Sequence, residues 1–145
     1  MLEEIPTILP KKDGITETKT QGHITFDNVS FAYSDNAEEP VIRNVSFTAK
    51  PGETVAFIGS TGSGKSTLIQ LIPRFFDVTT GSIKIDDVDV RDYDIDVLRK
   101  KIGYVPQRAV LFSGTIEENL RFGNENATQE ELEHDVEIAQ AKDFV

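Results

Sequence analysis

Residues 59–67 read GSTGSGKST and match the pattern G-x-x-x-x-G-K-[ST] at Gly59, Gly64, Lys65 and Ser66. Glycine lets the backbone curl so that successive N–H groups point at an anion, and a helix that begins here adds its own free N–H groups. Lys65 supplies a cation for the β and γ phosphates of a nucleotide, and the Ser66 hydroxyl can ligate Mg²⁺. The pattern therefore predicts a phosphate-binding loop.

The residues on both sides of this loop provide the context that such a motif needs. Four apolar residues, Val55–Ile58, come directly before it and predict a strand buried on both faces, as in a parallel sheet. Apolar residues at helical spacing follow from Leu68 to Phe75, with Pro73 ending the last turn. No acid occurs from residue 55 to residue 76, so nothing there repels an anion. A chance match is expected in about one per cent of chains of this length, and the context favours nucleotide binding.

The residues before the loop alternate with a period of two, which predicts a half-exposed antiparallel sheet. Ile24 and Phe26 alternate with polar residues, and the alternation resumes with the opposite parity at Val29. The change of phase at Asp27-Asn28 predicts either a bulge or a turn between two strand pieces. Residues 1–21 have no sustained period and are interpreted as a linker or a poorly ordered arm.

After the loop, strand and helix patterns alternate, and this is typical of an α/β protein. We expect a hairpin over residues 82–90 around Asp86-Asp87, a helix over 94–101 and an apolar strand over 102–105. Two capping boxes predict the starts of two further helices, at Thr115 with Glu118 and at Thr128 with Glu131.

Composition excludes several classes of protein. The 145 residues carry 25 acids and 15 bases, for a net charge of −10, which argues against a nucleic-acid backbone as the main partner. The absence of Cys excludes a disulfide framework, a thiolate zinc site and a Cys nucleophile. No run of about 18 apolar residues exists, and no basic stretch followed by an apolar one marks a secretory signal.

Several separate stretches together resemble the nucleotide-binding domain of an exporter-type ABC transporter, whose membrane domains are fused to it. They are ITFDNVSFAY (24–33), VIRNVSFTAKPGETVAFIGSTGSGKST (41–67), LIPRFFDVTTGSIKIDDVDVRDYDIDVLRKKIGYVPQ (71–107) and LFSGTIEENLRFG (111–123). The resemblance extends from about Gly22 to Val145. It implies an α/β fold, with a P-loop NTPase core and an N-terminal antiparallel β subdomain.

The resemblance also implies roles for single residues. It implies that Tyr33 stacks on adenine, although the residue alone favours an aromatic packed in the sheet. It implies that Thr67 contacts the α-phosphate, and that Gln107 reaches Mg²⁺ and the attacking water and links the site to the membrane domains. Lys65 and Gln107 are then the catalytic candidates, and Ser66 and Gln107 the Mg²⁺ ligands. The expected nucleotide-binding residues are Tyr33, Gly59, Ser60, Thr61, Gly62, Ser63, Gly64, Lys65, Ser66 and Thr67.

The chain departs from the family pattern at several points beyond the phosphate loop. The family usually has Gly at the position of Asp87, which affects only a hairpin turn. The family's Walker B strand, which ends in acids, has no counterpart, because the one later run of four apolar residues, Ala109–Phe112, ends at Ser113. Residues 111–115 resemble the LSGGQ signature only superficially. The expectation is a linker over 1–21 and a partial domain over 22–145, truncated before the Walker B strand, with the Q-loop around Gln107 and the start of the helical subdomain.

The function that the resemblance implies is ATP binding in an exporter ATPase at the cytoplasmic face of a membrane. ATP and Mg²⁺ are the expected cofactors, a second nucleotide-binding domain and a fused transmembrane domain the expected partners, and no nucleic acid is expected. The fragment itself is expected to be soluble and to bind ATP–Mg²⁺ without hydrolysis. An alternative is a soluble ABC-type ATPase module of translation or DNA repair, against which the acidic balance and the segment after Gln107 count.

Overall fold

The structure is a computed structural model that describes residues 8–19, 21–34, 36–108 and 110–143. The chain divides into two compact units, Met1–Gly103 and Tyr104–Val145. The first seven residues of the expected linker, Asp35 in the loop after the first expected strand, and Ala109 in the later apolar run lie outside the described residues.

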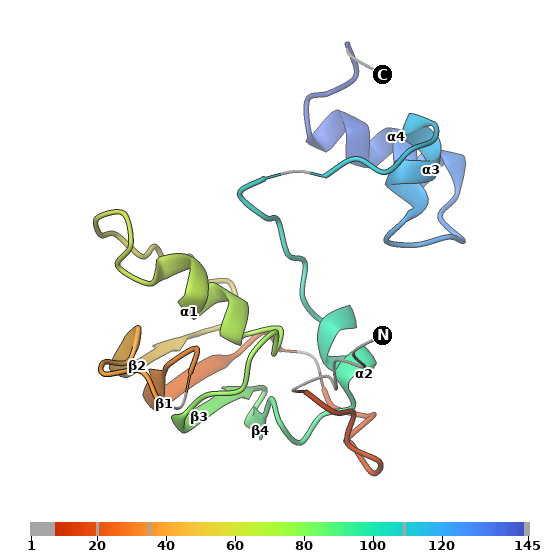
Figure 1. The fold of residues 1–145 in the computed structure, drawn as a ribbon. Helices are drawn as coiled ribbons and strands as arrows, with labels where there is room; N and C mark the ends of the chain where they lie inside the picture. The colour runs from red at the N-terminus through yellow and green to blue at the C-terminus, as the bar shows by residue number, and fades with distance from the viewer. Residues whose placement is uncertain (1–7, 20, 35, 109, 144–145) are drawn as a thin grey trace, which may run out of the picture. The chain divides into compact units, whose positions relative to one another are not determined.

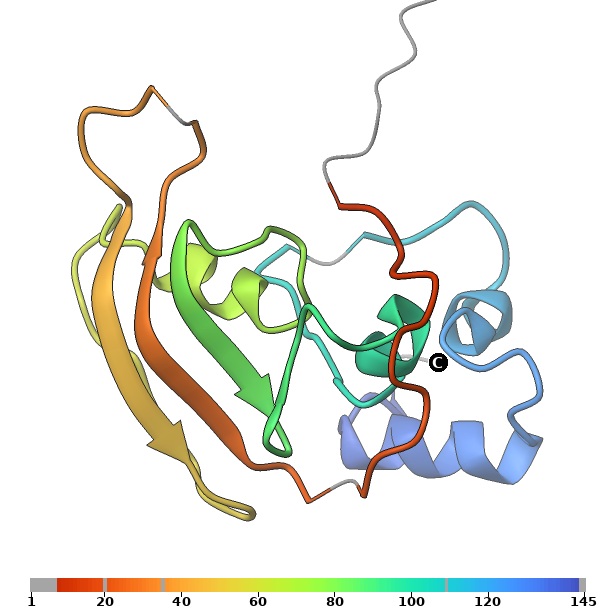
Figure 2. The ribbon, with the colours of Figure 1, turned by 90° about the horizontal axis from the view of Figure 1, so that it is seen from below.

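An antiparallel sheet of four strands forms the framework of the first unit (Figure 2). Its strand order is β2-β1-β3-β4, and every pairing is antiparallel. Phe26 in the central strand is paired with Phe47 on one side and with Ile83 on the other. The predicted antiparallel subdomain is therefore present, with the bounds β1 Ile24–Phe31, β2 Ile42–Ala49, β3 Thr80–Ile85 and β4 Val88–Asp89.

The predicted bulge in β1 is confirmed by a break in the pairing register. The register with β2 shifts between Phe26 and Val29, and Asn28 has the left-handed φ of 47°. Gly81 of β3 lies against this bulge, since a Cβ built on it would be 2.4 Å from the carbonyl oxygens of both Asp27 and Asn28. The bulge is thus matched to a glycine on the neighbouring strand.

The helix α1, Lys65–Leu71, lies across one face of the sheet (Figure 1). Its Leu68 and Leu71 are buried and join Phe26 and Ile83 of the sheet in one hydrophobic core. The predicted helix after the phosphate loop is confirmed, although its regular part ends at Leu71. Because the side of α1 that carries Leu68 and Leu71 is packed on the sheet, the start of α1 and the loop before it are held against the sheet.

Two predicted strands are absent from the described structure. No strand forms at Val55–Ile58 or at Ile102–Val105, so the predictions of a buried strand at the first and of an apolar strand at the second are wrong. Ile58 is 97% exposed and Val105 is 93% exposed. A strand forms only where the backbone of a neighbouring strand pairs with it, and the described sheet, β2-β1-β3-β4, contains neither segment.

The arm before β1 contacts the fold beside α2, Ile95–Lys100, which confirms the helix predicted over 94–101 and is capped by the Asp94 side chain. Ile15 forms a parallel bridge to Tyr93, and the phenol of Tyr93 is buried and donates to the carbonyl of Ile85 at 2.8 Å. Gly14 passes so close that a Cβ on it would lie 2.4 Å from the Asp94 nitrogen. At Gly14 and Ile15, the expected linker is therefore held against the residues just before α2.

A carboxylate in the β3–β4 turn holds the end of this arm. Asp86 and Asp87 form the predicted turn, with φ angles of 51° and 65°. The Asp86 Oδ1 accepts from the backbone N–H groups of residues 21, 22 and 23 at 3.1, 2.9 and 3.1 Å. Its other oxygen lies 3.9 Å from the Lys101 ammonium. The turn therefore fixes the point at which the chain enters β1.

Replacing Asp86 with asparagine is expected to destabilise the domain by about 1–3 kcal/mol, because a neutral oxygen replaces a buried charged acceptor of three N–H groups. Asparagine tolerates the left-handed backbone, so the change tests the charge rather than the turn. The matched control is Asp87→Asn, whose side chain is 90% exposed, and we expect an effect within about 0.5 kcal/mol. Urea unfolding measures the free energy of unfolding of both variants. Equal losses of stability in the two would contradict the role of the Asp86 carboxylate in holding residues 21–23.

The second unit contains two short helices, α3 Ile116–Arg121 and α4 Gln129–Ile138. Both predicted capping boxes are present, since Thr115 and Thr128 each exchange hydrogen bonds with the glutamate three residues later. Phe112 stacks on Phe122 with ring centroids 4.4 Å apart. Across the residues that the structure describes, no helix has both the length and the apolar character needed to cross a bilayer.

A candidate nucleotide-binding site

The loop from Gly59 to Thr67 adopts a conformation that depends on its glycines. Gly62 and Gly64 have φ angles of 82° and 86°, which side chains rarely adopt. A Cβ on Gly64 would lie 2.7 Å from the Ile42 side chain and 3.1 Å from the Val41 carbonyl oxygen. The backbone of the loop therefore turns tightly and packs directly against the start of β2.

Lys65 extends its ammonium group back across the loop. Its Nζ donates to the carbonyl oxygens of Gly59 and Ser60 at 2.8 and 2.7 Å, and to the Ser63 hydroxyl at 3.2 Å. These contacts hold the ammonium at the mouth of the loop. The first turn of α1 contains no acid, so no carboxylate within that turn competes with an anion for it. The geometry suits a phosphate group that approaches Lys65 from solvent.

Thr67 and Tyr33 meet although they are far apart in the sequence. Their hydroxyl oxygens lie 2.9 Å apart, at hydrogen-bond distance. Thr67 is on α1 and only 7% exposed, whereas Tyr33 follows β1 and is 56% exposed. The structure thus places the expected adenine-stacking residue next to the residue expected to contact the α-phosphate.

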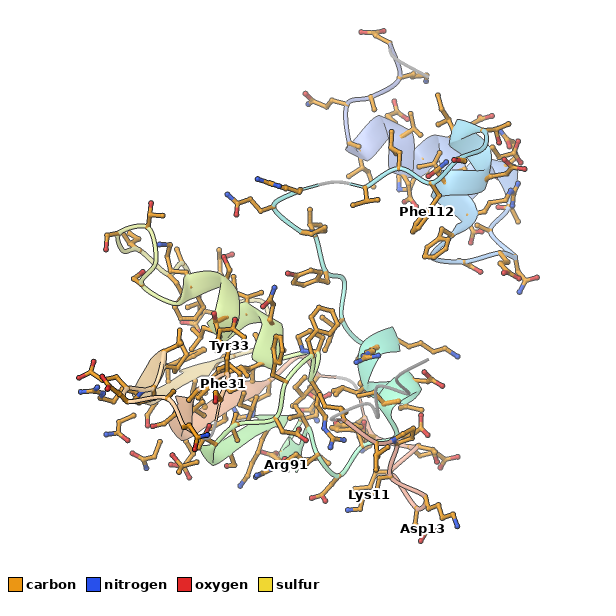
Figure 3. The ribbon with its side chains drawn as sticks, viewed as in Figure 1. Lys11, Asp13, Phe31, Tyr33, Arg91 and Phe112 are labelled. Atoms are coloured by element: carbon orange, nitrogen blue, oxygen red, sulfur yellow. The ribbon has the colours of Figure 1, made fainter. Side chains whose placement is uncertain are left out.

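The ring of Tyr33 lies beside that of Phe31 (Figure 3) and packs nearly perpendicular to the rings of Phe31 and Phe76. Its centroid lies 4.9 Å from that of Phe31 and 5.2 Å from that of Phe76, with interplanar angles of 82° and 89°. This packing agrees with the alternative interpretation, an aromatic packed against the sheet, although Tyr33 remains 56% exposed. The exposed part of the ring is available to a base.

The remaining predicted residues fall into two groups. Ser60, Thr61, Ser63 and Ser66 are exposed, or line the exposed loop, in the first unit. Gln107 belongs to the second unit, where it is exposed. The structure therefore brings the loop together with Tyr33, and the role of Gln107 stays a prediction. Among the described residues, no group of three His, Cys, Asp or Glu side chains forms a metal site.

Sequence reasoning missed the partners that hold Tyr33. Phe76 and the hydroxyl-to-hydroxyl contact of Thr67 fix its side chain. The sequence shows that Phe31 and Phe76 are aromatic, and this was the only signal that could have identified them as partners. Because Phe76 is far from Tyr33 in the sequence, the contact between the three rings could not be predicted.

Comparison with known proteins adds to this geometry. The family model described as "ABC transporter" matches residues 42–145, which is more than half of the chain. The chain belongs to the ABC transporter family. The match contains the whole phosphate loop and extends through both helices of the second unit. Membership of this family implies that the domain binds ATP.

Relatives of this ABC transporter domain have similar sequences over nearly all of its length. It is 47% identical over 135 residues, or 93% of the chain, to the uncharacterized ABC transporter ATP-binding protein YfiB of Bacillus subtilis. It is 43% identical over its full length to the beta-(1→2)glucan export ATP-binding/permease protein NdvA of Rhodopseudomonas palustris. The chain spans 23% and 24% of the lengths of these two relatives.

A solved structure has the same fold. A bacterial Atm1-family ABC exporter with ATP bound superposes with a TM-score of 0.89 and 32% sequence identity, covering 98% of this chain and 24% of that one. This agreement supports the predicted nucleotide-binding-domain fold, including its antiparallel β subdomain, although two predicted strands are not formed.

Proposed function

We propose that residues 22–145 bind the triphosphate of ATP in the loop 59–67 and the base against Tyr33. The observation that carries the proposal is the convergence of the two parts, since Tyr33 contacts Thr67 at the end of the loop. The Lys65 ammonium at the loop mouth provides charge for the phosphates. Membership of a family whose relatives are called ATP-binding proteins supports the ligand.

Mg²⁺ fits this loop through the Ser66 hydroxyl. Hard oxygen ligands and phosphate oxygens are what Mg²⁺ prefers, and Ser66 is exposed at the start of α1. When bound, the ion would neutralise charge on the phosphates. Ser66 would hold one coordination position, and Gln107 is proposed to add a second ligand and to orient water. Lys65 would bind and orient the phosphates.

We further propose that the whole protein is an exporter in which this domain is fused to a transmembrane domain, pairs with a second nucleotide-binding domain, and lies at the cytoplasmic face of the membrane. The support is the name of NdvA, an export ATP-binding/permease protein of which the chain matches only 24%. The complete reading frame tests the fusion. Transmembrane helices encoded ahead of the domain are expected, and a frame that encodes none would favour a soluble ABC-type ATPase.

For the 145-residue chain itself, we expect ATP binding without turnover. After the phosphate loop, its sequence contains no apolar run of four that ends in an acid, so it supplies no carboxylate of that kind to activate water. Calorimetric titration with ATP and Mg²⁺ measures binding, and a steady-state phosphate-release assay measures hydrolysis. The control is Lys65→Ala, and turnover that this variant loses would show that the chain is itself an ATPase.

A further inference from the structure

The contact between Tyr33 and Thr67 joins the two ends of the proposed nucleotide site. Tyr33 lies where the base is proposed to bind, and Thr67 lies where the phosphates are proposed to bind. Their oxygens are 2.9 Å apart, and Thr67 is only 7% exposed. Because both groups are hydroxyls, each can donate one proton and accept others.

We propose that the Tyr33 hydroxyl is a positioning group for the phosphates, which acts through the hydroxyl of Thr67. The inference rests on the proposed ATP site and deepens it. A phosphate oxygen only accepts hydrogen bonds, so a Thr67 hydroxyl that contacts it must give its own proton to the phosphate. The Tyr33 hydroxyl must then be the donor to Thr67 Oγ1, and the three groups form a chain of hydrogen bonds from phenol to threonine to phosphate.

Such a chain has two physical consequences. The phenol polarises the threonine hydroxyl and strengthens its bond to the phosphate. It also holds the Thr67 side chain in the rotamer that meets the ligand, so less conformational entropy is lost on binding. Tyr33 therefore contributes to phosphate binding without touching a phosphate, in addition to its stacking role.

The remaining contacts of Tyr33 keep it in place for this role. Phe31 and Phe76 meet its ring at nearly right angles, which limits rotation of the ring. The backbone just before it is tied to the residues ahead of β3, because the Ala32 N–H donates to the Thr79 hydroxyl at 3.1 Å. The hydroxyl of Tyr33 is thus presented to Thr67 from a fixed direction before any ligand arrives.

The test uses the 145-residue chain and two ligands, ATP and inorganic tripolyphosphate, each with Mg²⁺. Tyr33→Phe keeps the ring and removes only the hydroxyl. Loss of one hydrogen bond predicts that it weakens ATP binding about threefold to tenfold. It should weaken tripolyphosphate binding by the same factor, since the effect passes through Thr67 and not through the base. A residue that acted only by stacking would leave tripolyphosphate unaffected.

A double-mutant cycle with Thr67 separates this coupling from a general loss of structure. In a Thr67→Val background, Tyr33→Phe should have no further effect, whereas in a Thr67→Ser background, which keeps the hydroxyl, it should retain its full effect. Thermal unfolding checks each variant, and if Thr67→Val does not fold, the comparison of Tyr33→Phe with wild type on tripolyphosphate decides the question alone.

Several results would overturn the inference. Tighter binding by Tyr33→Phe would mean that the contact competes with the ligand, and additive effects or an unchanged affinity for tripolyphosphate would mean that Tyr33 and Thr67 act independently. Failure of the wild-type chain to bind either ligand would instead overturn the proposed function, so the two failures are distinguishable.

Discussion

Lys65→Ala is expected to weaken ATP binding by about 2 kcal/mol or more, close to a thirtyfold loss of affinity, because it removes a cation from a charge-assisted contact with phosphate. The structure places this ammonium 2.7 and 2.8 Å from two carbonyl oxygens of the loop, so it is already held where the phosphates are proposed to bind. The loss should therefore appear with both ATP and tripolyphosphate, as measured by calorimetric titration.

The same side chain also ties the loop together, so a structural effect must be separated from a binding effect. Lys65→Ala removes three hydrogen bonds within the loop, and thermal unfolding of the free variant reports how much stability they supply. Lys12→Ala is the matched control, since it removes the same charge from an exposed position of the arm. Equal affinities for all three proteins would mean that the phosphate loop is not formed in solution.

Gly81→Ala is expected to destabilise the domain by about 2–5 kcal/mol, from two additive causes. The left-handed φ of 83° costs a residue with a side chain about 1–2 kcal/mol. A Cβ at this position would also lie 2.4 Å from two carbonyl oxygens of the bulge in β1, and relieving such an overlap typically costs about 1–3 kcal/mol. Backbone atoms, unlike a flexible side chain, cannot move aside at small cost.

Gly52→Ala is the control that isolates the first cause. Gly52 has a φ of 76°, and a Cβ on it would have no neighbour within 4 Å. The substitution Gly52→Ala should therefore lower the free energy of unfolding by only about 1–2 kcal/mol. The chain has no Trp, so far-ultraviolet circular dichroism in urea is the suitable measurement. If Gly81→Ala unfolds at the same urea concentration as Gly52→Ala, the close packing of β3 on the bulge is not present.

Features that depend on a few neighbouring residues could be predicted from the sequence. The capping boxes at Thr115 and Thr128, the helix over 94–101 and the turn at Asp86-Asp87 are all present. Each is specified by hydrogen bonds or backbone preferences within about four residues. The bulge at residues 27–28 was predictable for the same reason, since a break of parity in one strand is visible locally.

Features that depend on distant residues could not be predicted in this way. The apolar run Val55–Ile58 predicted a strand, but a strand forms only where neighbouring strands pair with it. The apolar character of the run does not identify those neighbouring strands. The contact of Tyr33 with Thr67, and that of Asp86 with residues 21–23, join segments far apart in the chain. The phosphate loop itself was recognisable because its glycines and lysine act within nine consecutive residues.

The Asp86 contact has a mechanical consequence. One carboxylate oxygen holds the backbone of residues 21, 22 and 23, and β1 begins at the next residue, Ile24. A force applied along the arm therefore reaches the β3–β4 hairpin and the central strand together. A displacement of residues 21–23 is therefore passed on to the sheet that carries α1 by two routes, along the chain into β1 and through the Asp86 carboxylate into the turn after β3.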